Sequence, residues 1–203
     1  MSANILVITS SISGQQSFST RLANGILRKL QAAHPGSAVT SRDLAQQPFP
    51  HLEADHMGAF ATPATDRSPE QSEKARLSDE AVKELFEADH IIIGVPMYNF
   101  GISGYLKSWL NHIARAGITF SYAGGSPEGL LKGKKVYLAI ATGGIYTSGA
   151  MKQMDFTEPY LRTVLGFLGM SDITVFRTEG MNIPELRETA LPAALETVEA
   201  FAF

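Results

Sequence analysis

The chain has 203 residues, a formal net charge of −3 and no cysteine. Its length fits one domain, residues 1–203, and its composition, 44% hydrophobic and 18% charged, is globular rather than disordered. The lack of cysteine excludes disulfides, thiolate metal ligands and cysteine nucleophiles, and the weakly acidic charge gives no basic surface for nucleic acid.

The first residues, MSANILVITSS, contain no basic leader, and no stretch of the chain approaches the length of a membrane span. They read as a first strand rather than a signal peptide. We therefore expect a cytoplasmic protein with no membrane partner.

A hydroxyl-rich loop follows the first predicted strand, residues 5–8, and leads into a helix that begins near Ser17. The N–H groups at a helix start attract phosphate, and hydroxyls add donors without adding charge. The loop is therefore a candidate phosphate site. The alternative is that Ser17 or Ser19 only caps the helix. Gly14 is the only glycine of the loop, which excludes P-loop and Rossmann patterns.

The second predicted strand, residues 39–44, precedes an irregular connection over residues 46–70 that contains four prolines. A connection this long suggests a flap near the active site or a partner subunit. His51 and His56 lie in it without a third metal ligand, so we interpret them as surface histidines and predict no metal site. Residues 71–88 form the next predicted helix, with Phe86 on its buried face.

The third predicted strand, residues 91–95, is a continuous apolar run, which is typical of a central parallel strand covered on both faces. Pro96 ends it, and the following turn contains Met97, Tyr98, Asn99 and Phe100. An amide side chain suits the edge of a flat heteroaromatic ring, and aromatic rings can cover its face. The alternative is a tight turn whose aromatic side chains lie in the core. A helix over residues 102–113 follows.

The second half of the chain continues the alternation of strands and helices. After a loop with Phe120 and Tyr122, which in extended backbone point the same way, comes a buried strand over residues 136–141. Gly143 and Gly144 follow it and allow close backbone approach or positive φ. We then expect a helix over 155–168 with Phe156 buried, a strand over 173–176, and a last helix that begins at Pro184 and kinks at Pro192.

This order predicts an α/β protein with a flavodoxin-like doubly wound sheet of five parallel strands, order 2-1-3-4-5, and helices on both faces. In that topology the loops after strands one, three and four meet at the carboxyl edge of the sheet. They bring together a phosphate site, a ring-edge turn and a glycine loop. These are the three features that FMN requires, and FMN is therefore the expected cofactor.

The chain also resembles the FMN-dependent NADH:quinone oxidoreductases of the azoreductase type over nearly its whole length. The segments that carry the resemblance are Pro96-Met97-Tyr98-Asn99-Phe100, Ala114-Arg115-Ala116-Gly117-Ile118-Thr119-Phe120, Pro127-Glu128-Gly129-Leu130 and Pro159-Tyr160-Leu161. The resemblance implies tightly bound FMN, NADH or NADPH as electron donor, and ping-pong two-electron transfer to a quinone or an azo compound. It also implies a homodimer with the flavin at the subunit interface.

Residue by residue, the resemblance implies a set of FMN contacts and a substrate pocket. The FMN contacts are Ser11, Ser17, Phe18, Ser19, Met97, Tyr98, Asn99, Phe100, Ala141, Thr142, Gly143 and Gly144. The family often reads Ser-Arg-Gly-Gly where this chain has Ala141 to Gly144, so side-chain contacts differ there. The substrate pocket comprises Phe120, Tyr122 and Tyr146. Tyr146 stands where relatives often carry His; the catalytic residue stays open, with water and Tyr146 as the two candidate sources of the proton.

Two other functions fit the same kind of sheet. A flavodoxin-type electron carrier would bind FMN without oxidising NAD(P)H, but it would not need the long loops over residues 46–70 and 117–129. A receiver-type signalling domain would carry acidic residues after the first strand to hold Mg²⁺. Thr9, Ser10 and Ser11 stand there instead.

Overall fold

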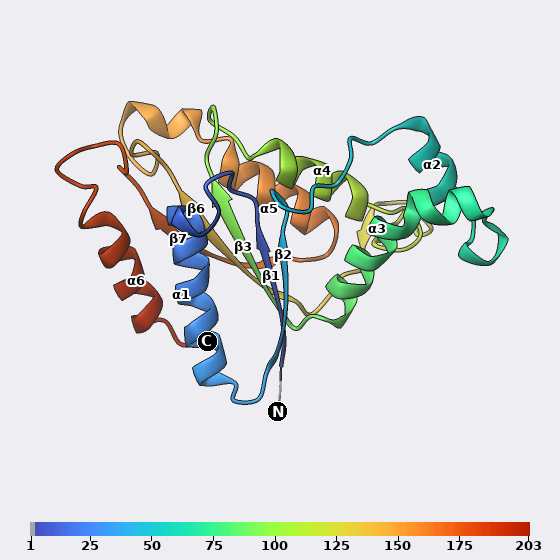
Figure 1. Cartoon of the computed structure of the whole chain (residues 1–203), viewed down its shortest axis with the longest axis horizontal. Coiled ribbons are helices and arrows are strands. Elements are labelled where there is room, and N and C mark those ends of the chain that lie inside the picture. Colours follow the sequence, from blue (N-terminus) through green and yellow to red (C-terminus); the bar gives the residue numbers. More distant parts are fainter. Residues whose placement is uncertain (1–2) are drawn as a thin grey trace.

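The computed structural model describes residues 3–203 and contains the predicted parallel sheet (Figure 1). Its five strands are β1 (Asn4–Thr9), β2 (Ala38–Asp43), β3 (His90–Pro96), β6 (Lys135–Ala141) and β7 (Asp172–Thr178). They lie in the order β2-β1-β3-β6-β7, and every neighbouring pair is parallel. Counted in chain order, this is the expected 2-1-3-4-5 arrangement, so the predicted fold is confirmed.

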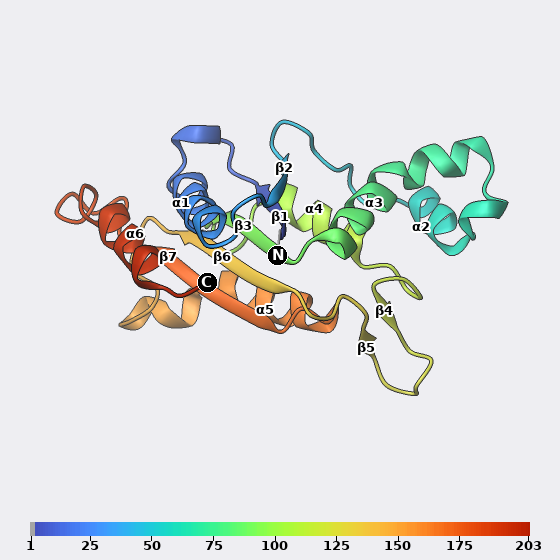
Figure 2. The same cartoon turned by 90° about the horizontal axis from the view of Figure 1, so that it is seen from below.

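Helices cover both faces of the sheet (Figure 2). One face packs against α1 (Phe18–Ala33) and α6 (Ala190–Ala200), and the other against α3 (Pro69–Glu87), α4 (Gly104–Ile113) and α5 (Thr157–Phe167). Because side chains alternate along a strand, Leu6 and Ile8 of β1 join the core under α3 to α5, whereas Ile5 and Val7 join the core under α1 and α6. The apolar runs of the central strands are thus explained by burial on both sides.

The long connection and the last helix differ from the sequence-based expectation. The connection over residues 46–70 contains a helix, α2 (Ala54–Ala61), and a 3₁₀ turn, η2 (Ala64–Asp66). The last helix begins at Ala190 rather than at Pro184, and turns fill the interval. Pro192 therefore lies in the first helical turn, where the missing N–H breaks no helical hydrogen bond. The predicted kink at Pro192 loses its basis.

His56 is buried, so its interpretation as a surface histidine is wrong. Its Nδ1 accepts a hydrogen bond from the Glu53 N–H at 3.1 Å, and its ring centre lies 5.0 Å from that of His112. The Arg115 guanidinium lies 4.1 Å from the ring centre of Phe60, and Phe60 packs against His112 at 5.7 Å. These contacts fasten α2 to the end of α4. The sequence did not reveal them because the residues lie far apart along the chain.

His112 is expected to make the stability of the fold depend on pH. Burial lowers the pKa of His112, and the neighbouring His56 and Arg115 add to this effect. The stabilisation from the neutral ring is therefore complete above its ordinary pKa of about 6.5 and is lost as the pH falls towards the lower folded value. Urea denaturation at pH 7.5 and pH 5.0 measures this loss. His112→Gln keeps an amide donor for the Pro50 carbonyl, which lies 3.1 Å from Nε2, and we expect it to lose less stability on acidification. An equal loss in both proteins would contradict the assignment.

Candidate functional site

A cavity of about 360 Å³ lies at the carboxyl edge of the sheet, where the loops after β1, β3 and β6 meet. Figure 1 shows these loops side by side at the top of the sheet. The cavity brings together Ser11, Ser17, Phe18, Met97, Tyr98, Ala141, Thr142 and Gly143, all of them predicted site residues. Ser13, Gln16, Pro96, Met181 and Asn182 complete its wall. None of these side chains carries a formal charge, so any anion in the cavity meets only neutral donors.

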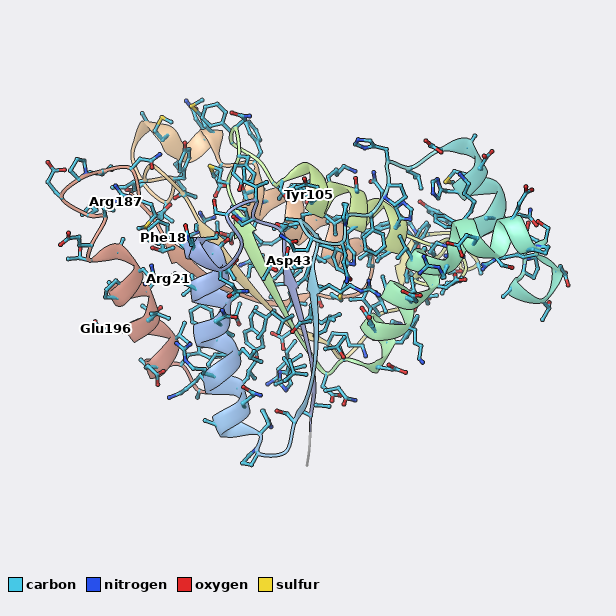
Figure 3. All side chains as sticks on the ribbon, in the orientation of Figure 1. Phe18, Arg21, Asp43, Tyr105, Arg187 and Glu196 are labelled. Atoms are coloured by element: carbon cyan, nitrogen blue, oxygen red, sulfur yellow. The ribbon has the colours of Figure 1, made fainter. Side chains whose placement is uncertain are left out.

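The start of α1 forms one end of the cavity. Ser17 is the N-cap residue, but its side chain accepts no hydrogen bond from the helix, and the first turn contains no acidic residue. Its Oγ instead lies 3.0 Å from Ser19 Oγ. Phe18 follows at the upper end of the helix (Figure 3). Ser17 thus occupies the N-cap position without a capping hydrogen bond from its side chain, and Ser19 lies inside the helix. The N–H groups of the first turn and the positive end of the helix dipole therefore remain available to another acceptor.

A pair of hydroxyls joins the loop after β1 to the turn after β3. Ser11 Oγ lies 3.3 Å from the hydroxyl oxygen of Tyr98, and that oxygen accepts the Ile12 N–H at 3.3 Å. Ser11 Oγ also accepts the Ser13 N–H at 3.2 Å. The helix-start end of the cavity and its aromatic end are thus fixed relative to each other by side chains that line the cavity.

The turn after β3 has an unusual backbone. Tyr98 and Gly101 exchange two hydrogen bonds, at 2.9 and 3.0 Å, and the two residues between them, Asn99 and Phe100, have φ values of 47° and 69°. Positive φ is rare for residues other than glycine, and such positions persist only where the surroundings enforce them. Asn99 and Phe100 are exposed at the tip and do not line the cavity. The alternative of core-packed turn aromatics is wrong, since Phe100 keeps 37% of its surface exposed.

The loop after β6 lies close to the chain after β7. The N–H groups of Gly180, Met181 and Asn182 donate to the carbonyls of Gly144, Thr142 and Gly143 at 2.9–3.1 Å. A Cβ on Gly143 would lie 2.5 Å from Asn182 Nδ2, so a larger residue at this position would displace the Asn182 amide, and φ of Gly143 is not positive. The Thr142 hydroxyl donates to the Gly144 carbonyl at 2.7 Å. It is therefore directed at its own loop.

Within a single copy of the chain, the three residues of the predicted substrate pocket do not line one common cavity. Phe120 belongs to β4 (Phe120–Ser121), which pairs with β5 (Glu128–Gly129) in a hairpin that projects from the rest of the chain (Figure 2). The ring of Phe120 packs against Tyr122 and Phe167, and neither Phe120 nor Tyr122 lines the cavity. Tyr146 lies beside the turn after β3, with its ring centre 6.4 Å from that of Phe100.

A second cavity, of about 400 Å³, shares Tyr98 as a lining residue with the first. Residues 48–51 of the long connection line it together with Ile12, Tyr98 and Tyr105. Tyr105 lies on α4 near the top of the molecule (Figure 3). Residues 48–51 thus share Tyr98 with the candidate site but do not line its cavity, and the flap near the active site or a partner subunit stays a prediction. Met181 and Asn182 were missed because the sequence pointed to the loops after strands one, three and four, whereas these residues follow the edge strand β7.

Comparison with known proteins agrees with this arrangement. Residues 3–202 match a family model described as a flavodoxin-like fold. The chain is 49% identical over 177 residues to an FMN-dependent NADH:quinone oxidoreductase of Herminiimonas arsenicoxydans, which covers 87% of each chain. The chain belongs to the FMN-dependent NADH:quinone oxidoreductase family. The corresponding protein of Mesorhizobium japonicum is 46% identical over 97% of this chain and 94% of its own. The predicted membership is thus confirmed.

This member of the FMN-dependent NADH:quinone oxidoreductase family is also similar to solved structures of azoreductases. The azoreductase of Bacillus anthracis str. Sterne superimposes with a TM-score of 0.88 at 26% identity over 98% of both chains. The azoreductase AzrA gives the same TM-score at 27% identity and the same coverage. Both likenesses extend over nearly the whole chain.

Proposed function

We propose that the chain is an FMN-dependent NADH:quinone oxidoreductase that also reduces azo compounds, and that residues 1–203 act as one domain. The observation that carries the proposal is the uncharged cavity where the start of α1, the left-handed turn and the Gly143 loop meet. The names of the family relatives and of the azoreductase structures support it. Relatives named for NADH favour NADH as donor, with NADPH as the alternative.

The helix-start end of the cavity fits a phosphate group. Ser11, Ser17 and Phe18 line it, and the first turn of α1 has N–H groups without a side-chain cap. A phosphate is bound well by such N–H groups and by hydroxyls, and it needs no lysine or arginine there. Ser19 is fully buried and hydrogen-bonded to Ser17, so we assign it the role of orienting the Ser17 hydroxyl.

The other end of the cavity fits a flat ring. Met97 and Tyr98 line one side, and Ala141, Thr142 and Gly143 line the other, with Asn182 as an exposed amide beside them. We place Asn99, Phe100 and Gly144 at the outer margin of this ring site. Bound FMN supplies two-electron transfer between a nicotinamide and an acceptor, and the protein binds and orients the reactants.

Tyr146 is our candidate proton donor, because it is a phenol next to the turn that carries Phe100. If the Tyr146 hydroxyl supplies a proton to the acceptor, Tyr146→Phe lowers kcat for quinone and azo substrates by about 100-fold or more, as is usual when a general acid is removed. The rate of NADH oxidation in the first half-reaction then stays unchanged. Stopped-flow measurement of the two half-reactions separates these effects. Unchanged rates for every acceptor would remove Tyr146 from the mechanism.

We also propose a homodimer in the cytoplasm, without a nucleic-acid partner. Tyr122 is 60% exposed on a hairpin that lies outside the cavity of its own chain, and Phe120 packs against it. In a homodimer, Phe120 and Tyr122 of one copy would form walls of the substrate pocket at the cavity of the other copy. Within residues 3–203, no helix combines the length and the apolar character needed to cross a membrane. Light scattering of the purified protein measures the oligomeric state.

Steady-state kinetics test the proposed activity. We expect NADH oxidation that depends on both FMN and a small quinone, with parallel lines in double-reciprocal plots, as ping-pong transfer requires. A flavodoxin-type carrier would bind FMN but show almost no NADH oxidation. That result would overturn the assignment as an oxidoreductase and favour the carrier.

A further inference from the structure

The segment from Tyr146 to Phe156, which we name the strap, contacts the turn after β3 at both of its ends. At the first end, the Tyr146 ring packs edge-on against the Phe100 ring. At the second end, the Phe156 N–H donates to the Phe100 carbonyl at 3.0 Å. Between them the strap contains a 3₁₀ turn, η3 (Ala150–Met154). Figure 1 shows it, in light orange, at the top of the molecule beside the loop after β3.

Each end of the strap is also held by a carboxylate. Glu179, just after β7, accepts the Tyr146 N–H at 2.8 Å and the Thr147 hydroxyl. At the other end, Asp155 Oδ1 accepts the Thr157 N–H at 2.8 Å. The middle of the strap has no comparable support, since Met151, Lys152 and Gln153 are exposed.

The Arg177 guanidinium connects the two carboxylates, Asp155 and Glu179, that hold the ends of the strap. Arg177 Nη2 lies 2.5 Å from Asp155 Oδ2 and 2.7 Å from Glu158 Oε2, and its Nη1 lies 3.7 Å from Glu179 Oε1. The side chains of Arg177, Asp155 and Glu179 retain 12%, 8% and 14% of their surface, so salt screens these interactions little. Without the guanidinium, three carboxylates would face one another in a mostly buried space.

We propose that Arg177 is a positioning residue of the flavin pocket: through Asp155 and Glu179 it holds both ends of the strap against the Phe100 turn. The proposal rests on the proposed function, since the turn is part of the FMN site. Asn99 and Phe100 have left-handed backbone that needs external support. The strap provides that support at the Phe100 carbonyl and ring. Loss of Arg177 frees the strap, lets the turn relax and weakens FMN binding without removing any group that contacts FMN.

Two measurements on Arg177→Met test the proposal. Lys152 is exposed in the strap, and tryptic cleavage after it reports how often the strap leaves its place. We expect cleavage at Lys152 to become about tenfold faster than in the wild type, with other sites unchanged. We expect the Kd for FMN, from quenching of flavin fluorescence, to rise by about tenfold. Arg177→Lys keeps the positive charge but loses the planar guanidinium that reaches several carboxylates. Its cleavage rate and its Kd for FMN should therefore lie between those of the wild type and of Arg177→Met.

Arg162→Met is the matched control. Arg162 Nε pairs with the same Glu158 at 2.7 Å from an exposed position on α5, but it contacts neither Asp155 nor Glu179. This variant should leave Lys152 cleavage and FMN affinity at wild-type values. A folded Arg177→Met protein that matches the wild type in both measurements would overturn the proposal.

If Arg177→Met does not fold, the Glu179→Gln variant tests the proposal instead. Its amide oxygen still accepts the Tyr146 N–H, but the charge that faces Arg177 is gone. Faster cleavage at Lys152 then supports the proposal, and wild-type cleavage overturns it. A wild-type protein that takes up no FMN would instead refute the proposed function, and the cleavage measurement would still decide whether Arg177 holds the strap.

Discussion

Ser17→Asp is expected to weaken FMN binding by at least about 100-fold, or 2.7 kcal/mol, and to leave the apoprotein as stable as the wild type or more stable. The new carboxylate at the N-cap of α1 can accept the uncapped first-turn N–H groups and interacts favourably with the helix dipole. It also lies where we place the phosphate, which it repels. Fluorescence titration with FMN and urea denaturation of the apoprotein measure the two opposite effects.

Ser68→Asp is the control for this substitution. Ser68 is the N-cap of α3, where its hydroxyl accepts the Gln71 N–H at 3.2 Å, and it does not line the cavity. A carboxylate there should leave FMN affinity unchanged. If Ser17→Asp binds FMN as tightly as Ser68→Asp does, the phosphate is not at the start of α1 and the orientation assigned to the cofactor is wrong.

Asp79→Ala is expected to lower the free energy of unfolding by about 3 kcal/mol or more, because it leaves two buried guanidinium groups without their shared carboxylate. Asp79 pairs with Arg67 and, at 3.0 Å, with Arg115, whose side chains retain only 5% and 1% of their surface. Burial lowers the pKa of Arg115, Asp79 opposes that shift, and Arg67 adds to it. Urea denaturation at pH 7 measures the loss.

Glu73→Ala provides the comparison for Asp79→Ala. Glu73 lies on the same helix and pairs with Arg76, but both side chains are exposed, at 70% and 50%. Its removal should change stability by less than about 1 kcal/mol. Equal effects of the two substitutions would show that the buried guanidinium groups do not depend on Asp79.

The sheet was predictable because its signal is local. The apolar runs of β1, β3 and β6 are continuous, and only strands buried on both faces tolerate such runs. Helix faces were less predictable. Phe86 and Phe156 lie at helical spacing from buried residues, yet they are 44% and 62% exposed. Phe156 precedes α5 and so leaves the helical face altogether.

The candidate site was predictable where one loop carries its own chemistry. The hydroxyls after β1 and the Met97-Tyr98 pair after β3 do meet in one cavity. Residues that matter through distant partners were not predictable. Asn182 approaches Gly143 only because β7 is the neighbour of β6, and Arg115 and Arg177 are buried only because carboxylates far along the chain meet them. From a sequence alone, charged residues are predicted to lie at the surface, because they are buried only where a partner neutralises them.

Uptake of FMN by the purified chain tests the central claim most directly. We expect a yellow protein that binds one FMN per chain and releases FMN rather than FAD on denaturation. On binding, the FMN fluorescence should be quenched and its absorption spectrum should shift. A folded, colourless protein whose spectrum and fluorescence titration show no uptake of added FMN would contradict this claim.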